Sequence, residues 1–138
     1  MRKLAAALAV AGAAAGAFGV AAPANASTNP YDPDEICGSN YHNIDHHDFK
    51  TGYGSLMATT YLEYNGSTDC VVTLNRTGIL EKWDTGATIQ VSGKSAVTDR
   101  DDYTYYAGPV RGYAPGVCIK WGGHFDEQNW TSDWSHCR

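Results

Sequence analysis

The chain has 138 residues and a formal net charge of −5, with 18% charged and 12% aromatic residues. An acidic surface repels phosphate backbones and anionic lipid, so the composition excludes nucleic acid and membrane surfaces as partners. Beyond the N-terminal run, no apolar stretch is long enough to span a bilayer. We therefore expect no membrane insertion once that run is removed.

Residues 1–26 have the pattern of a secretory signal peptide. Two basic residues precede an Ala-rich apolar run, and 23-PANA-26 has the spacing that signal peptidase requires. We expect cleavage after Ala26 and a secreted, extracellular chain 27–138; an uncleaved membrane anchor is the disfavoured alternative, because alanine and glycine are only weakly apolar. Without the two leader cations, 8 basic and 15 acidic residues remain, a net charge of −7.

The four cysteines predict two disulfides, because an even count in a small exported chain is typical of a covalent framework. Cys37, Cys70, Cys118 and Cys137 all lie in the expected mature chain. A zinc site would need closely spaced pairs of ligands, which are missing. Because chain ends lie close together in compact domains, we favour the pairs Cys37–Cys137 and Cys70–Cys118. The other two pairings stay open.

After a polar arm over 27–36, which we expect to be flexible, the sequence predicts short β-strands in a single domain, 37–138. The segment 65-NGSTD-69 favours a hairpin, since Asn-Gly is a strong turn signal. Only 78-GILEKWDTG-86 has helical spacing, and it is short. The expected strands are 56–64, 70–75, 87–93, 103–108, 109–113 and 117–121.

These regularly spaced strands, with few helix formers, predict an all-β fold. We expect a small antiparallel β-sandwich or open barrel, stabilised by the disulfides. Within 117–121, Trp121 shares a strand face with Ile119, so we expect it in the core.

The segment 41-YHNIDHHDFK-50 holds three of the five histidines. In an extended strand, His42 and His46 would share one face with Ile44 between them, and His47 would lie on the other. Two such imidazoles are too far apart to hold one ion, and a third ligand is missing. We expect an edge strand with Ile44 pointing inward and no evolved metal site.

The sequence shows no catalytic constellation. The segment 52-GYGSL-56 resembles a nucleophile elbow, but its serine stands one position late and the closing glycine is missing. The run 99-DRDD-102 has the alternate aspartates of some calcium sites but is more typical of a solvated turn. We therefore expect no enzyme activity, no catalytic residue, and no bound cofactor or metal.

Aromatic residues are the remaining candidates for contact with a ligand or partner. Tyrosine and tryptophan combine an apolar ring with a polar group and anchor both sugars and protein interfaces. The two tryptophans in 125-FDEQNWTSDW-134 either fasten the tail to the sheet, which we favour, or form a contact patch. The candidate contact residues are Tyr105, Tyr106, Arg111, Tyr113, Trp130 and Trp134.

Several segments of the mature chain resemble the spore-associated protein A family, small secreted proteins of Streptomyces and related actinobacteria. The resemblance implies an exported β-rich domain found with spores, and it implies no established activity. The histidines His46 and His47 and the final Arg138 depart from the family pattern. The matching segments are 37-CGSNY-41, 61-YLEYNGSTDCVVTLN-75, 91-VSGKSAVTD-99, 104-TYYAGPVRGYAPGVCIKWGG-123 and 134-WSHC-137.

Three functional hypotheses follow from the sequence. The first is a non-enzymatic structural or interaction protein that binds a spore or cell-surface component. The second is a module that binds extracellular or cell-wall glycan through its exposed aromatic rings. The third is a secreted protease inhibitor, which would need a rigid exposed loop next to a disulfide, and no segment suits this well.

Overall fold

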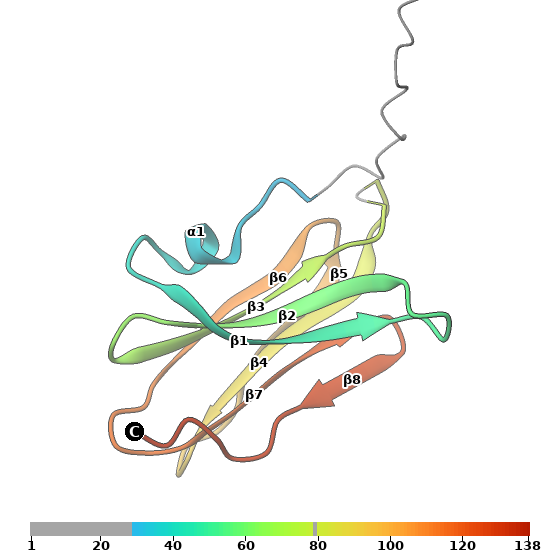
Figure 1. Cartoon of the computed structure of the whole chain (residues 1–138). Coiled ribbons are helices and arrows are strands. Elements are labelled where there is room, and N and C mark those ends of the chain that lie inside the picture. Colours follow the sequence, from blue (N-terminus) through green and yellow to red (C-terminus); the bar gives the residue numbers. More distant parts are fainter. Residues whose placement is uncertain (1–28, 79) are drawn as a thin grey trace, which may run out of the picture.

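The computed structural model describes residues 29–78 and 80–138, so the expected signal peptide and its cleavage site lie outside it. In the described part, two antiparallel sheets enclose a core (Figure 1). Sheet A has the strand order β1-β2-β3-β6 and sheet B the order β5-β4-β7-β8. The predicted all-β sandwich is confirmed, as two open sheets. The strands are β1 His42–Lys50, β2 Leu56–Tyr64, β3 Thr68–Asn75, β4 Trp83–Val91, β5 Val97–Tyr103, β6 Tyr106–Tyr113, β7 Ile119–Phe125 and β8 Gln128–Thr131.

The core lies between the inner faces of the central strands, which present apolar residues in alternation. Trp121 is 1% exposed, which confirms its expected place in the core. At the centre, the hydroxyls of Thr60 and Thr73 lie 2.7 Å apart, and Thr73 donates to the carbonyl of Gly86 at 2.8 Å. This hydrogen bond joins the two sheets. Gly123 of β7 lies against both threonines, where a Cβ atom would not fit.

The predicted turn between β2 and β3 is confirmed, and β2 has the predicted bounds. Asn65 Oδ1 accepts hydrogen bonds from the amides of Ser67 at 3.1 Å and Thr68 at 2.8 Å. Gly66 has a φ of +103°, in the region that favours glycine. The side chain of Asn65 therefore closes the turn locally.

Two segments differ from their expected structure. The run 99–102, expected as a solvated turn, lies within β5, and residues 128–131 of the expected polar tail form β8. The helical spacing in 78–86 was too short to predict a helix, and residues 83–86 belong to β4. Both β5 and β8 are edge strands that are mostly exposed, so they lack the apolar alternation by which strands are recognised.

The disulfides join Cys37 to Cys70 and Cys118 to Cys137, which corrects the favoured pairing. Cys70 lies on the outer face of sheet A, where it meets Cys37. Cys118 directly precedes β7, and the segment before Cys137 pairs back onto β7 through two backbone hydrogen bonds between Ile119 and Ser135. Each bridge thus fastens a terminal segment to a strand next to it, rather than joining the two termini.

A short helix, α1 (Pro33–Cys37), lies over the outer face of sheet A (Figure 1). Asp32 caps it by accepting a hydrogen bond from the Asp34 amide at 2.9 Å, and proline stands at its first position. The described residues of the segment expected to be a flexible arm, 29–36, have defined contacts from Asn29 onward and include the start of α1.

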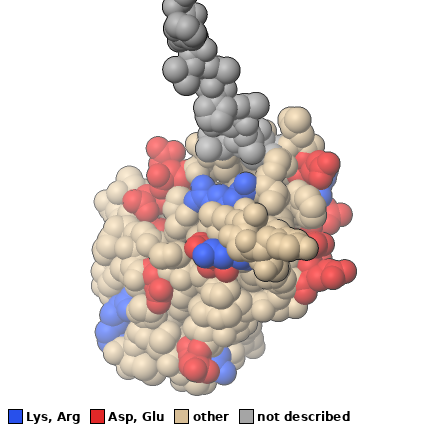
Figure 2. Space-filling model, turned by 45° about the vertical axis from the view of Figure 1, so that its right-hand side comes forward, with Lys and Arg blue, Asp and Glu red and all other residues tan. Residues whose placement is uncertain are grey.

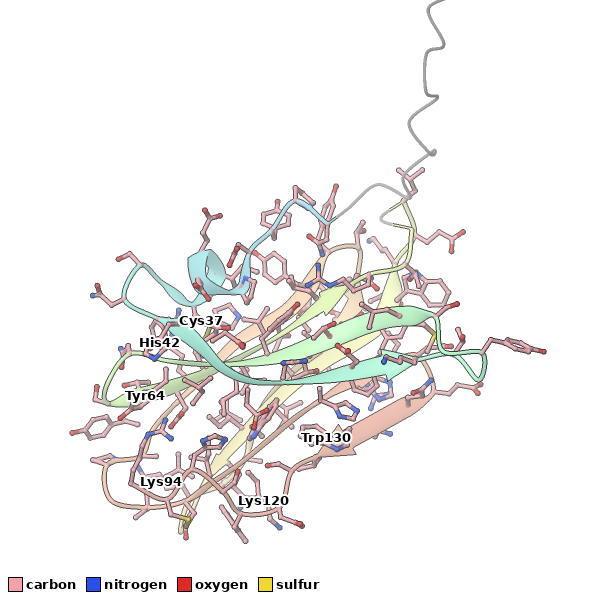
Figure 3. All side chains as sticks on the ribbon, in the orientation of Figure 1. Cys37, His42, Tyr64, Lys94, Lys120 and Trp130 are labelled. Atoms are coloured by element: carbon pink, nitrogen blue, oxygen red, sulfur yellow. A yellow bond between two sulfur atoms is a disulfide. The ribbon has the colours of Figure 1, made fainter. Side chains whose placement is uncertain are left out.

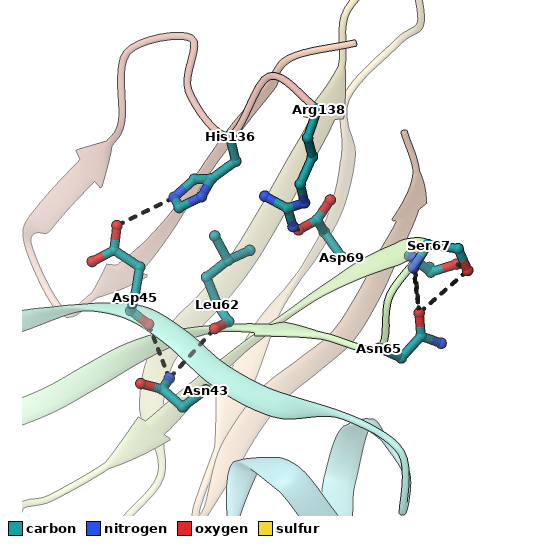
Figure 4. Close-up of polar contacts among 9 residues, drawn as sticks. Asn43, Asp45, Leu62, Asn65, Ser67, Asp69, His136 and Arg138 are labelled. Atoms are coloured by element: carbon teal, nitrogen blue, oxygen red, sulfur yellow. Dashed lines mark hydrogen bonds and ion pairs between the residues drawn. The ribbon is translucent and has the colours of Figure 1, made fainter. Parts of the chain in front are cut away.

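The C-terminal segment crosses from sheet B to sheet A (Figure 4). His136 Nε2 lies 3.3 Å from Asp45 Oδ2, and Arg138 Nη2 lies 2.7 Å from Asp69 Oδ1. Burial raises the pKa of the Asp69 carboxyl, and the Arg138 guanidinium opposes this. Arg138, one of the residues that depart from the family pattern, therefore pairs with a buried carboxylate and links the two sheets.

Candidate functional site

The six candidate contact residues do not form one site but lie in four places. Trp130 belongs to β8, and its ring faces His47 of β1 (Figure 3). Its ring stacks on His47 with centroids 4.1 Å apart and planes 3° from parallel, and it meets Trp121 edge-on at 4.9 Å. Burial lowers the pKa of His47. Trp130 therefore packs the edge of the core, which suits the favoured role of fastening the tail.

Trp134 is 44% exposed and lies under Lys120, whose Nζ is 4.9 Å from the ring centroid. Arg111 and Tyr113 line a small cleft of about 130 Å³ beside the β4–β5 turn. The Arg111 guanidinium also donates to the Cys37 carbonyl at 2.8 Å, so it helps to hold α1. Neither place gathers several aromatic rings.

Tyr105 and Tyr106 do come together, and a third tyrosine joins them. The Tyr31 ring lies 5.2 Å from Tyr105 and 5.1 Å from Tyr106, at interplanar angles of 64° and 68°. The three rings border a groove of about 530 Å³, which we call the aromatic groove. Its lining residues are Tyr31, Lys82, Asp99, Asp102, Tyr103, Thr104, Tyr105, Tyr106 and Gly108.

The loop that carries Tyr105 is held by two asparagines. The side-chain amide of Asn75 donates to the carbonyls of Tyr103 at 3.3 Å and Thr104 at 3.0 Å. The backbone amide of Asn75 donates to the Tyr105 carbonyl at 2.9 Å. Asn29 donates to the same Tyr105 carbonyl at 2.7 Å. The loop's backbone acceptors are thus bound before any ligand arrives, which fixes the positions of the rings.

The floor of the aromatic groove is polar and tightly paired. Tyr103 donates its hydroxyl to Asp99 Oδ1 at 2.5 Å, and the Gly108 amide donates to Asp99 Oδ2 at 2.8 Å. The hydrogen bond to Asp99 raises the pKa of the Tyr103 phenol to about 12. Gly108 has a φ of +94° and lies so close to β3 that a Cβ would clash with the Val71 carbonyl. Glycine is therefore required for the amide to reach Asp99.

Lys82 and Asp102 supply exposed charges of opposite sign in the lining of the aromatic groove. Sequence reasoning found Tyr105 and Tyr106 but missed Lys82, Asp102 and Tyr31. Tyr31 was missed because its segment was expected to be a flexible arm. The Asp32–Pro33 pair, a common start of a helix, was the available signal that the arm is ordered.

The histidine-rich strand β1 is an edge strand, as expected, and Ile44 packs against the core. A β-bulge between Asn43 and Asp45 shifts the register, so His42 pairs with Tyr64 and His46 with Tyr61. Because those partners are an odd number of residues apart, His42 and His46 lie on opposite faces. The expectation of a shared face is therefore wrong. Among residues 29–78 and 80–138, no three metal-ligating side chains are grouped.

The outer face of sheet B carries a polar network. Arg100 donates to both carboxylate oxygens of Asp84, at 2.9 and 2.7 Å, and His124 Nε2 lies 3.1 Å from Asp84 Oδ2. His124 Nδ1 faces Asn129 Oδ1 at 2.5 Å. The Arg100 hydrogen bonds are the largest cause of a pKa of about 2 for Asp84. Gly86, between Arg100 and His124, leaves a hollow of about 150 Å³.

The face shown in Figure 2 carries its charges in small separate groups, with neutral surface between them. Over the part of the chain that the structure describes, no helix is long and apolar enough to cross a membrane. The basic groups on this face form no continuous band, so nothing there resembles a nucleic-acid footprint.

Comparison with known proteins gives one relative. Spore-associated protein A from Streptomyces coelicolor is 34% identical over 90 residues, which cover 64% of this chain and 55% of that protein. The chain thus spans about half the length of this curated relative. No family model and no solved structure matches the chain. A surface or extracellular location fits both this relative and the two disulfides. The similarity to Spore-associated protein A supports the resemblance found in the sequence.

Proposed function

We propose that the chain is a secreted, non-enzymatic protein that attaches to the spore or cell surface. The similarity to Spore-associated protein A carries this proposal. A small sandwich with two disulfides suits it, because covalent bridges protect a small domain outside the cell. Its partner would be a surface component, either glycan or protein.

The arrangement around His124 supports the non-enzymatic part of this proposal. A histidine that activates a nucleophile needs one ring nitrogen toward a carboxylate and the other toward a hydroxyl or thiol. Here Asp84 faces one nitrogen, but Asn129 faces the other. His124 therefore stands in a structural network rather than beside a nucleophile. The inhibitor hypothesis stays a prediction from the sequence, and no feature of the site favours it.

Fractionation of spores tests the proposal. The full chain with a C-terminal tag is expressed in sporulating Streptomyces coelicolor, and washed spores, mycelium and medium are probed for the tag. We expect the protein on washed spores or mycelial walls. A reporter exported behind residues 1–28 is the control and should remain in the medium. Recovery of the full chain from the medium alone would refute surface attachment.

A further inference from the structure

We propose that the aromatic groove binds a single chain of a neutral polysaccharide, built from hexose or N-acetylhexosamine units. This inference rests on the proposed function, because it names the class of surface component that the protein would hold. It assigns to Tyr31, Tyr105 and Tyr106 the contacts with the sugar rings, and to Lys82 and Asp102 the contacts with their hydroxyls.

The groove has the size and lining of a ligand site. Its volume of about 530 Å³ lies within the usual range for small-ligand pockets, roughly 300–1,000 Å³. Tyr31 is 43% exposed and Tyr105 is 38% exposed, so both rings present free surface. Tyrosine rings contact the C–H faces of sugars while the phenol groups remain available for hydrogen bonds. Rings exposed around one hollow, unlike single exposed residues, mark a place of contact.

The angles between the rings specify the form of the ligand. Tyr31 stands edge-on to both neighbours, at 64° and 68°. The three rings therefore form the sides of a groove rather than a flat row. A flat row would suit a crystalline polysaccharide surface, whereas a groove accepts one chain at a time.

The charges specify a neutral ligand. Asp99 and Asp102 are acidic and Lys82 is basic, which leaves a net charge of −1 among the residues of the lining. Both Asp99 oxygens already accept a hydrogen bond each from Tyr103 and Gly108, so this carboxylate has a structural role in the groove. A polymer of phosphate or uronic acid would be repelled. Uncharged hydroxyl and acetamido groups fit the remaining donors and acceptors.

The groove is also held in its binding shape. Asn75 and Asn29 bind the backbone carbonyls of the loop 103–105, and the bridge Cys37–Cys70 anchors the segment that carries Tyr31. A ligand therefore orders few side chains when it binds, and this lowers the entropic penalty of binding.

Titration of the exported, disulfide-bonded chain with soluble oligosaccharides tests the inference. The probes are N-acetylchitotetraose and cellotetraose, followed by calorimetry and by proton NMR of the tyrosine rings. We expect saturable binding of at least one probe, and the two arms distinguish an N-acetylhexosamine ligand from a hexose ligand. Ring signals of Tyr31 and Tyr105 should shift. Those of Tyr53, fully exposed in the β1–β2 turn, should not.

Substitutions then locate the site. Tyr105→Ala and Tyr31→Ala should each weaken binding about tenfold, because each removes a ring in contact with the ligand. Tyr105→Phe keeps the ring and should retain most of the affinity. Tyr53→Ala is the matched control and should bind as the wild type does. If a variant fails to fold, the NMR shifts of the wild-type rings decide alone.

The inference is overturned if neither probe binds at millimolar concentration, if Tyr53→Ala weakens binding as much as Tyr105→Ala, or if a polyanion such as teichoic acid binds instead. Retention on spores without oligosaccharide binding would leave the proposed function standing and refute the groove assignment. Oligosaccharide binding without retention on spores would refute the proposed function and leave the groove assignment standing.

Discussion

The outer faces of the two sheets place a carboxylate in opposite surroundings. Glu63 of β2 is buried, and burial is the largest cause of a pKa raised to about 8. Asp84 of β4 is 39% exposed, and the hydrogen bonds from Arg100 lower its pKa to about 2. Burial beneath α1 thus raises the pKa of one carboxyl group, whereas pairing with Arg100 on the open face lowers the pKa of the other.

The proton on Glu63 is part of how α1 is attached. Glu63 Oε1 accepts from the Asn43 amide at 3.0 Å, while Oε2 has no hydrogen-bond partner among the described residues. The neighbouring Asp34 carboxyl adds to the rise in the pKa of Glu63. Two carboxyl groups in contact share such a site only if one carries a proton. Because burial, the largest cause, and the neighbouring Asp34 carboxyl raise the pKa of Glu63 to about 8, we infer that Glu63 keeps its proton at neutral pH.

Releasing α1 from sheet A should have the largest effect on stability. The double substitution Cys37→Ser with Cys70→Ser opens a loop closed over 33 residues, which should lower the free energy of unfolding by about 3–4 kcal/mol in the chain-entropy model. Hydrogen exchange should accelerate more in β3 than in β4, because α1 lies only over sheet A. Urea unfolding and exchange measured by NMR check both expectations.

The matched control is the double substitution Cys118→Ser with Cys137→Ser, which opens a loop over 19 residues. The free energy of unfolding should fall by about 3 kcal/mol, but hydrogen exchange in β3 should not accelerate. Equal acceleration in β3 for both variants would contradict the idea that α1 is a cover for sheet A.

Glu63→Gln should remove a pH dependence of stability. The folded protein keeps the Glu63 proton up to a pH of about 8, whereas the unfolded chain releases it near the ordinary value of 4.5. Wild-type stability should therefore be complete below pH 4.5 and fall as the pH rises toward 8, by at most about 1.4 kcal/mol per unit. Glutamine imitates the protonated acid, so the variant should be more stable than the wild type at pH 9, by about 1–3 kcal/mol.

Urea unfolding from pH 4.5 to 9 measures this difference. Glu81→Gln, at an exposed position in the β3–β4 connection, is the control and should follow the wild-type curve. If the wild type gains stability between pH 5 and 8 relative to Glu63→Gln, Glu63 is ionised in the fold and the assigned proton is wrong.

Arg111→Met should weaken the attachment of α1 to sheet A without affecting ligand binding. The hydrogen bond from Arg111 to the Cys37 carbonyl would be lost, and the stability should fall by about 1 kcal/mol. Lys94→Met, in the β4–β5 turn, should change stability little. Because Arg111 was a candidate contact residue, retention on spores provides the second measurement. Retention that falls for Arg111→Met at unchanged stability would restore it as a contact.

The fold was predictable where apolar alternation is strong. Strand β2 has the bounds that its β-branched and aromatic residues predict, and the 65–69 turn follows from Asn-Gly. Edge strand β5 was missed, because both its faces are largely exposed and its aspartates resemble a turn. The bulge after Asn43 was also invisible, and one extra residue was enough to move His46 to the other face.

The candidate site was only half predictable. Tyr105 and Tyr106 stand in a motif rich in aromatic residues, so both could be chosen as candidate contacts from the sequence. The position of Tyr31 depends on Asn29, whose side chain bonds to a loop far along the chain, and no local pattern encodes such a contact. The disulfide pairs were missed for a similar reason, since closeness of the chain ends says nothing about which face each cysteine occupies.

Asp84→Asn, on the open face of sheet B, should have the smallest effect. The ionised carboxylate of Asp84 stabilises the fold fully above its unfolded pKa near 4, and this contribution is lost as the pH falls through about 2. Because the ion pair with Arg100 is solvent-exposed, the loss at pH 7 should be smaller than for Arg111→Met and should shrink further in high salt. Below pH 2 the stabilities of the wild type and the variant should converge. Thermal unfolding measured from pH 1.5 to 7 checks this. Asp102→Asn, across the strand pair from Asp84, is the control and should show no such convergence. A difference that grows toward acid would mean that Asp84 is stabilised in its protonated form, so the two sheet faces would no longer differ in the way described.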